Sequence, residues 1–243
     1  MKLRIEEAIR KGGGILIENP VIFVPAIGLG ILSIAFLFFT VPFPRLTEII
    51  RFSLTMILFV ILLLVGLFLS GMIIKMSYDA TKVSASLSGS ARFVAQKYGT
   101  LLKASIIFGF VVFLCSIPLL ISWMFVIAKS FYVFIIPLVG SVILVVFLVI
   151  KLIFYGYAIL IDESRAINSL KKSWNITKGK GNWCKVFVIA LFFWILKEIP
   201  RGLASMLPLN VLAILMFFII MFVTPWLYSS LTFAYIKLEE DVV

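Results

Sequence analysis

The stretch SRAINSLKKSWNITKGKGNW, residues 164–183, is the most polar part of the chain, and long apolar runs lie on both sides of it. All of its charged side chains are basic, and Trp174 stands near its middle. The flanking runs reach about 20 residues, which is enough for a helix to cross a hydrocarbon core of roughly 30 Å. A basic, Trp-bearing segment between two such runs is typical of a helix at the membrane surface.

The overall composition also indicates a membrane protein. Hydrophobic residues make up 63% of the 243 residues, and the mean hydropathy is +1.21, whereas a soluble domain is roughly 45–50% apolar. Continuous apolar runs favour helices over the strands of a membrane barrel, which alternate in segments of about 10 residues. We therefore predict an all-α integral membrane protein.

Six apolar runs predict a six-helix bundle with spans at 21–40, 52–76, 104–127, 131–161, 183–199 and 210–236. Basic residues concentrate before the first span and in the second and fourth connections. The opposite side of the membrane carries only Arg45, Arg51, Lys129, Lys197 and Arg201. By the positive-inside rule, we expect a multi-pass protein of the cell membrane with both termini in the cytoplasm. The net charge of +11 is then a topology signal, and we expect no nucleic-acid partner.

Three short segments resemble one another, and each precedes two spans: AIRKGGGI (8–15), SLSGSARF (86–93) and SLKKSWNI (169–176). Gly12, Ser90 and Ser173 occupy the same column of this alignment. We predict one domain, 1–243, built from three tandem repeats, each an interfacial amphipathic helix plus a transmembrane hairpin. The repeat units cover about 1–76, 77–161 and 162–243.

Each segment has an apolar stripe at helical spacing. The stripes are Ile5, Ala8, Ile9, Gly12, Ile15 and Leu16; Val83, Leu87, Ala91, Val94 and Tyr98; and Ile167, Leu170, Trp174 and Thr177. We expect these helices to lie flat on the cytoplasmic leaflet, with the stripe toward the acyl chains and the basic residues toward anionic headgroups.

Two interpretations of the basic helices stay open. They anchor and orient the hairpins, or they form a docking surface for lipid headgroups or for a cytoplasmic or membrane protein partner such as a transport ATPase. The candidate contact residues of the second interpretation are Arg92, Lys97, Lys171, Lys172, Trp174, Lys178 and Lys180.

The sequence offers no catalytic, cofactor-binding or metal-binding residues. It contains no His, no acidic pair within a span, and neither a nucleophile-elbow nor a zinc-protease motif. One charge lies inside the fourth predicted span, at Lys151. Either its long stem lets the ammonium reach the cytoplasmic interface, or the ammonium contacts a ligand or ion within the bundle.

The run YGYAILIDESRAINSLKKSWNITKGKGNWCKVFVIALFF (155–193) resembles a signature of uncharacterised prokaryotic membrane proteins. These are similar to the membrane domain attached to some glycerophosphodiester phosphodiesterases. Their signature is an apolar span, an acid, a small-residue turn and an Ala-Leu-basic-basic-Ser-Trp helix. The matching residues are Asp162, Ala166, Ile167, Leu170, Lys171, Lys172, Ser173 and Trp174, while Ser169 replaces the usual Ala. EAIRKGGGILIENPVIFVP (7–25) looks like the start of the same family.

The sequence does not contain the catalytic domain of those enzymes, so the resemblance implies a multi-span module without phosphodiesterase activity. We expect a non-catalytic membrane protein, either a permease-like or a lipid-contacting module, or a subunit of a larger complex. The alternative is a stand-alone transporter of small molecules or ions that uses Lys151. A third hypothesis is an intramembrane lipid-modifying enzyme.

Overall fold

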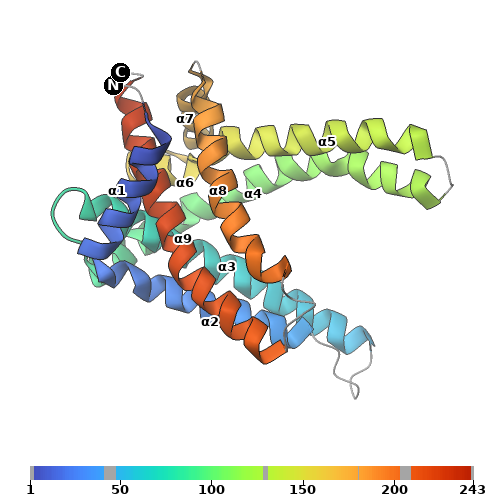
Figure 1. The fold of residues 1–243 in the computed structure, drawn as a ribbon, viewed down its shortest axis with the longest axis horizontal. Coiled ribbons are helices and arrows are strands. Elements are labelled where there is room, and N and C mark those ends of the chain that lie inside the picture. The colour runs from blue at the N-terminus through green and yellow to red at the C-terminus, as the bar shows by residue number, and fades with distance from the viewer. Residues whose placement is uncertain (1–2, 41–47, 128–130, 180, 203–208, 242–243) are drawn as a thin grey trace. The chain divides into compact units, whose positions relative to one another are not determined.

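A computed structural model describes residues 3–40, 48–127, 131–179, 181–202 and 209–241. Every element in these residues is a helix (Figure 1). The order is α1 (Ile5–Glu18), the 3-10 helix η1 (Pro20–Ile22), α2 (Phe23–Thr40), α3 (Glu48–Ala80), α4 (Leu87–Ile127), α5 (Phe131–Leu152), α6 (Tyr155–Leu160), α7 (Ala166–Lys178), α8 (Asn182–Gly202) and α9 (Leu209–Glu240).

The contacts divide the chain into two compact units. Unit 1 comprises Met1–Tyr98 and Cys184–Val243, and unit 2 comprises Gly99–Trp183. These borders differ from those of the predicted repeat units, whose arrangement as three tandem repeats in one domain stays a prediction.

Four helices in the described residues are long and apolar enough to cross a membrane: Phe52–Ala80, Leu87–Pro118, Leu138–Leu160 and Val211–Glu240. A fifth crossing exists if Ile5–Glu18 and Pro20–Phe36, which meet at 97°, are counted as one span. The all-α class is thereby confirmed for these residues, and the apolar helices are those of a multi-pass membrane protein. The count of six spans stays a prediction.

One predicted span is not found among these apolar helices. The fifth, 183–199, lies within α8, on which Lys185, Lys197, Glu198 and Arg201 place four charges. The fourth, 131–161, contains the apolar span Leu138–Leu160, which is interrupted between Leu152, where α5 ends, and Tyr155, where α6 begins.

The separate surface helix expected at 83–98 is also wrong. Leu87 begins α4, which continues without a break for 41 residues into the third predicted span. The residues between 98 and 104 include Gly99 but no proline. A single glycine costs only about 1 kcal/mol in a helix interior and does not end it.

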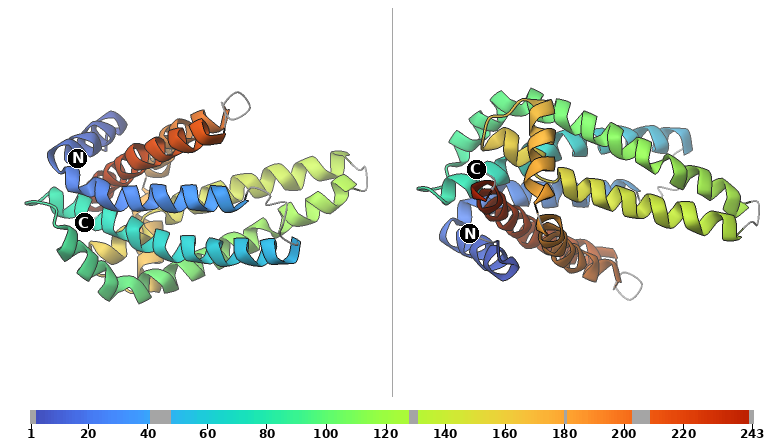
Figure 2. Two further views of the ribbon diagram at one scale, coloured as in Figure 1. Left: turned by 90° about the horizontal axis from the view of Figure 1, so that it is seen from below. Right: turned by 90° about the horizontal axis from the view of Figure 1, so that it is seen from above.

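In unit 1, α1 packs across α9, and α2 lies beside both α3 and α9 (Figure 2). A core forms where Leu16 of α1, Ala26 of α2, and Ile73 and Met76 of α3 meet. The start of α1 and the end of α9 lie near each other in all three views (Figures 1 and 2).

Small and polar residues bring α1, α3 and α9 close together. A Cβ atom on Gly12 would lie 2.6 Å from the backbone nitrogen of Ser230, so only glycine permits this approach. The indole N–H of Trp226 donates to the Ile9 carbonyl oxygen at 2.9 Å. The hydroxyls of Ser77 and Ser229, both fully buried, form a hydrogen bond of 2.8 Å between α3 and α9.

In unit 2, α7 packs against α5 and α6, and α5 begins near the end of α4 (Figure 1). The Tyr155 hydroxyl of α6 and the Ser105 hydroxyl of α4 form a hydrogen bond of 2.9 Å. The Tyr155 ring also lies 5.5 Å from that of Phe108. The short helix α6 is therefore held by α4 and α7.

Candidate functional site

Helix α7 carries the polar stretch of residues 164–183, and one of its faces is buried against protein, which the sequence did not predict. Ser169, Ser173, Ile176 and Thr177 are buried. Ile167 and Trp174, which belong to the predicted apolar stripe, are 60% and 38% exposed. Ile176 and the small residues of α7 thus face the protein, while Ile167 and Trp174 face outward.

The same burial occurs at the aligned positions of the other two segments. Gly12, Ser90 and Ser173 are all buried, and so are Leu16, Val94 and Thr177 four residues later. Residues at i and i+4 share one helix face. The alignment therefore marks a face that packs against protein, because small side chains let helix backbones approach closely.

The buried face of α7 bridges the break between α5 and α6. The Ser173 hydroxyl donates to the Lys151 carbonyl oxygen at 2.9 Å and accepts from the Phe154 N–H at 3.1 Å. The Thr177 hydroxyl also lies 3.2 Å from the Lys151 carbonyl oxygen. These bonds satisfy backbone groups at a helix break, which would otherwise be costly in an apolar surrounding.

Lys151 takes part in the same network through its side chain. Its Nζ donates to the Thr177 carbonyl oxygen at 3.0 Å, at the last turn of α7. The ammonium also lies 5.6 Å from the Phe147 ring and 5.4 Å from the Trp174 ring. Lys151 is 6% exposed and lines neither of the two pockets described below. A ligand contact by Lys151 stays a prediction, while its bond to α7 is a structural role that neither sequence interpretation included.

The outward face of α7 combines apolar and cationic groups. Lys171 and Lys178 are exposed. Lys172 instead pairs with Asp162 at 2.8 Å. Lys180 lies outside the described residues. Beside this face is a shallow groove of about 360 Å³, lined by Leu152, Leu170, Lys171, Trp174 and Asn175.

The two candidates from the second segment belong to α4 and to unit 1. Arg92 is exposed, and the Lys97 ammonium lies 5.8 Å from the Phe93 ring. Nothing in unit 1 or unit 2 by itself brings these two residues together with the basic residues of α7.

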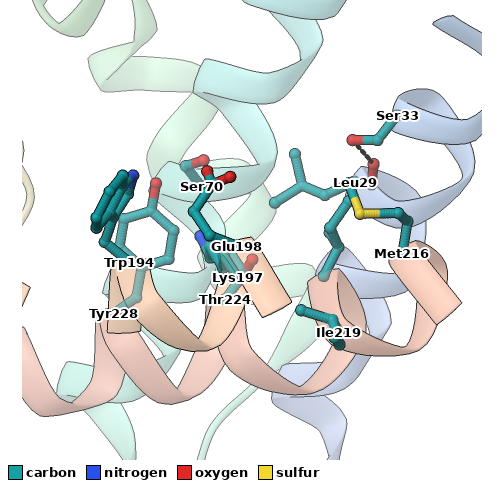
Figure 3. Close-up of a pocket in the computed structure, with 11 residues that line it drawn as sticks. Leu29, Ser33, Ser70, Trp194, Lys197, Glu198, Met216, Ile219, Thr224 and Tyr228 are labelled. Carbon is teal, nitrogen blue, oxygen red and sulfur yellow. Dashed lines mark hydrogen bonds between the residues drawn. The ribbon is translucent and has the colours of Figure 1, made fainter. Parts of the chain in front are cut away.

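A second pocket lies inside unit 1 and was missed from the sequence. It measures about 330 Å³ and lies among α2, α3, α8 and α9. Its lining residues are Leu29, Ser33, Ser70, Trp194, Lys197, Glu198, Met216, Ile219, Ile220, Thr224 and Tyr228. Figure 3 shows Ser70, Glu198 and Tyr228 gathered at one end and Leu29, Met216 and Ile219 at the other.

One sequence signal could have found this pocket. Lys197 and Glu198 fall inside the predicted span 183–199, yet Lys197 was counted with the outer connections. Ionisable residues within a membrane helix face the bundle interior or a water-filled cavity as a rule. The adjacent Lys-Glu pair was therefore a better marker of a site than the lone Lys151.

Comparison with known proteins places the chain in a family without giving it an activity. No curated protein and no solved structure matches it. The predicted resemblance to the membrane domain of glycerophosphodiester phosphodiesterases stays a prediction. One family matches residues 3–238, nearly the full length of the chain. The protein is thus a member of the family described as Domain of unknown function (DUF7847).

Proposed function

We propose that this chain is a non-catalytic, lipid-contacting protein of the cell membrane, which binds anionic lipids of the cytoplasmic leaflet along α7. The observation that carries the proposal is the division of α7 into two faces. Its Ser/Thr face is bonded to the α5–α6 break, while Trp174 and Lys171 line an open groove on the other side.

The groove has the chemistry of a headgroup site. The Lys171 ammonium supplies the positive charge, and Trp174 and Leu170 supply apolar area next to it. Trp is favoured at headgroup depth, where one end of its ring is apolar and the other polar. Each basic residue near an anionic membrane surface contributes about 1 kcal/mol of attraction.

The fixed position of α7 supports this function over mere anchoring. A helix that only anchors a hairpin needs no more than an apolar face in the lipid. Here, buried hydrogen bonds from Ser173 and Thr177 hold the helix in one rotation about its axis. Trp174 is also held by the Phe147 ring, at 6.0 Å between ring centroids. The groove is therefore preorganised before any lipid arrives.

The test uses the fluorescence of Trp174 in the purified full chain, placed in nanodiscs. Phosphatidylglycerol with brominated chains should quench Trp174 more than brominated phosphatidylcholine does. The Trp174 signal is the difference between the native protein and the Trp174→Phe variant. Replacing Lys171 and Lys178 by Gln removes about 2 kcal/mol of attraction and should weaken the anionic preference about 30-fold.

The matched control is the Lys11→Gln, Lys82→Gln variant. It removes the same charge from two exposed lysines outside α7 and should keep the preference. Equal quenching by both lipids in the native protein would refute the proposal. So would loss of a co-purifying protein in the α7 variant with an unchanged lipid preference, since that result assigns the face to a protein partner.

A further inference from the structure

The pocket of unit 1 has a polar end and an apolar end, as an amphiphile does. Ser70 of α3 and Tyr228 of α9 bring hydroxyls to one end, next to Glu198 of α8 (Figure 3). Leu29 of α2 and Met216 of α9 line the other end. All four helices belong to unit 1, so the pocket is complete within that unit.

The pocket lies at a depth where charge is costly. Thr224 lines it from the middle of α9, about 24 Å from either end of this helix at 1.5 Å per residue. A hydrocarbon core is roughly 30 Å thick, so the middle of such a helix lies inside it. Burying an ionisable side chain at this depth costs free energy, so such residues usually have a function and line substrate or ion pathways.

The ammonium of Lys197 is the group in this pocket that calls for a ligand. Among the described residues, none accepts a hydrogen bond from it or forms an ion pair with it. Glu198, its neighbour on α8, is already engaged in an interaction of its own. An ammonium that lines a membrane pocket without an acceptor is complemented by an anion.

The side chains next to Lys197 indicate which class of anion the pocket would bind. Ser70, Thr224 and Tyr228 offer hydroxyl donors from α3 and α9. A phosphate group has several strong acceptor oxygens and can use a lysine and hydroxyls together. Hydroxyl and ammonium donors at one end with aliphatic side chains at the other fit a phosphate attached to an acyl chain.

We propose that this pocket binds the phosphate group of a membrane amphiphile. Lys197 is the anchor, the Thr224 hydroxyl and the hydrogen-bonded hydroxyl pair of Ser70 and Tyr228 lie at the phosphate end, and the first part of one acyl chain lies along Leu29 and Met216. A volume of about 330 Å³ is at the small end for ligand pockets. The rest of the chain therefore leaves the pocket. Trp194, which lines the pocket and is 59% exposed, lies beside Tyr228 at the polar end (Figure 3).

The experiment uses Trp194 as the reporter in the full chain, purified in a mild detergent. Its signal is the difference between the native protein and the Trp194→Phe variant. Trp194 lies at the polar end, so its fluorescence should respond to the headgroup, and lysophosphatidic acid should bind at least tenfold more tightly than the monoacylglycerol with the same chain. Lys197→Met should weaken binding of the phosphate lipid at least tenfold, and Lys197→Arg should retain it.

The matched control is Lys185→Met on the same helix, since Lys185 does not line the pocket. It should leave the affinity unchanged. Equal affinity for the neutral lipid would overturn the phosphate assignment, and so would an unchanged affinity in a folded Lys197→Met variant. Competition by millimolar inorganic phosphate would show that free phosphate is the ligand and would overturn the amphiphile. Thermal unfolding of each variant establishes that it is folded.

Discussion

Replacing Ser173 by Ala should destabilise the protein more than the same change at Ser169, although both serines are fully buried on α7. The Ser173 hydroxyl donates to the Lys151 carbonyl oxygen at 2.9 Å and accepts from the Phe154 N–H at 3.1 Å. The Ser169 hydroxyl donates to the Ala166 carbonyl oxygen at 2.7 Å, inside its own helix. Only the first change removes bonds between elements.

The magnitude follows from what each substitution leaves behind. Ser173→Ala takes the acceptor from a buried backbone N–H, which costs about 1–3 kcal/mol. Hydrogen bonds between membrane helices contribute about 0.6 kcal/mol on average and up to about 1.7, so a loss of about 1–2 kcal/mol is expected. Ser169→Ala should cost less than about 0.5 kcal/mol. Alanine raises helix propensity equally at both sites, so this gain cancels in the comparison.

The assay is thermal unfolding of the purified full chain in a mild detergent. A loss of 1 kcal/mol lowers Tm by roughly 2–4 °C in a protein of this size, so Ser173→Ala should lower it by about 2–8 °C. Ser173→Thr retains a hydroxyl and should recover much of the loss. Equal Tm values for Ser173→Ala and Ser169→Ala would refute the argument that α7 bonds the α5–α6 break.

Two further predictions concern the packing of unit 1. Gly12→Ala would place a Cβ 2.7 Å from the Ser230 Cα and should cost about 1–3 kcal/mol. Gly14→Ala, where nothing lies within 4 Å, should raise the stability by up to about 1 kcal/mol. If thermal unfolding showed that both substitutions change the stability in the same direction, the close approach of α1 and α9 at Gly12 would be contradicted. A double-mutant cycle of Ser77→Ala and Ser229→Ala should give a coupling of about 0.6–1.7 kcal/mol, and strict additivity would show that their bond contributes nothing.

The membrane class and most apolar helices could be predicted from the sequence because hydrophobic length is a direct consequence of bilayer thickness. The predicted spans 52–76 and 210–236 lie within apolar helices of the structure. Whether residues 83–98 form a separate helix could not be predicted in the same way. Helical periodicity is identical for a helix that turns at the interface and for one that continues, so it could not show that α4 continues past Tyr98.

The packing faces were harder to predict because hydropathy marks large apolar residues. On α7, the stripe with Ile167 and Trp174 was assigned to the acyl chains and no face was assigned to protein, yet Ser173 forms a buried protein contact. A small polar residue is nearly invisible to a hydropathy argument, yet it allows the backbones to approach and supplies a hydrogen bond. The aligned positions Gly12, Ser90 and Ser173 did indicate the packing face. They did so because all three residues are small, and not because of their polarity.

The unit 1 pocket could not be assembled from the sequence because its residues come from four helices. Ser70 and Tyr228 are ordinary residues in their own helices, and only the packing brings them to the same end of a pocket as Glu198 (Figure 3). The sequence shows the charge of Lys197, but the count of basic residues used for the topology assigned Lys197 to a connection between spans. A count of basic residues per connection does not separate charges at the water boundary from charges inside a helix.

The bond between Ile9 and Trp226 joins residues that are 217 positions apart. The ribosome therefore makes α1 long before its packing partner α9. Until α9 has been made, the glycine face of α1 has no α9 to pack against and stays open to chaperones and proteases. The packing of α1 thus depends on residues that are translated more than 200 positions later.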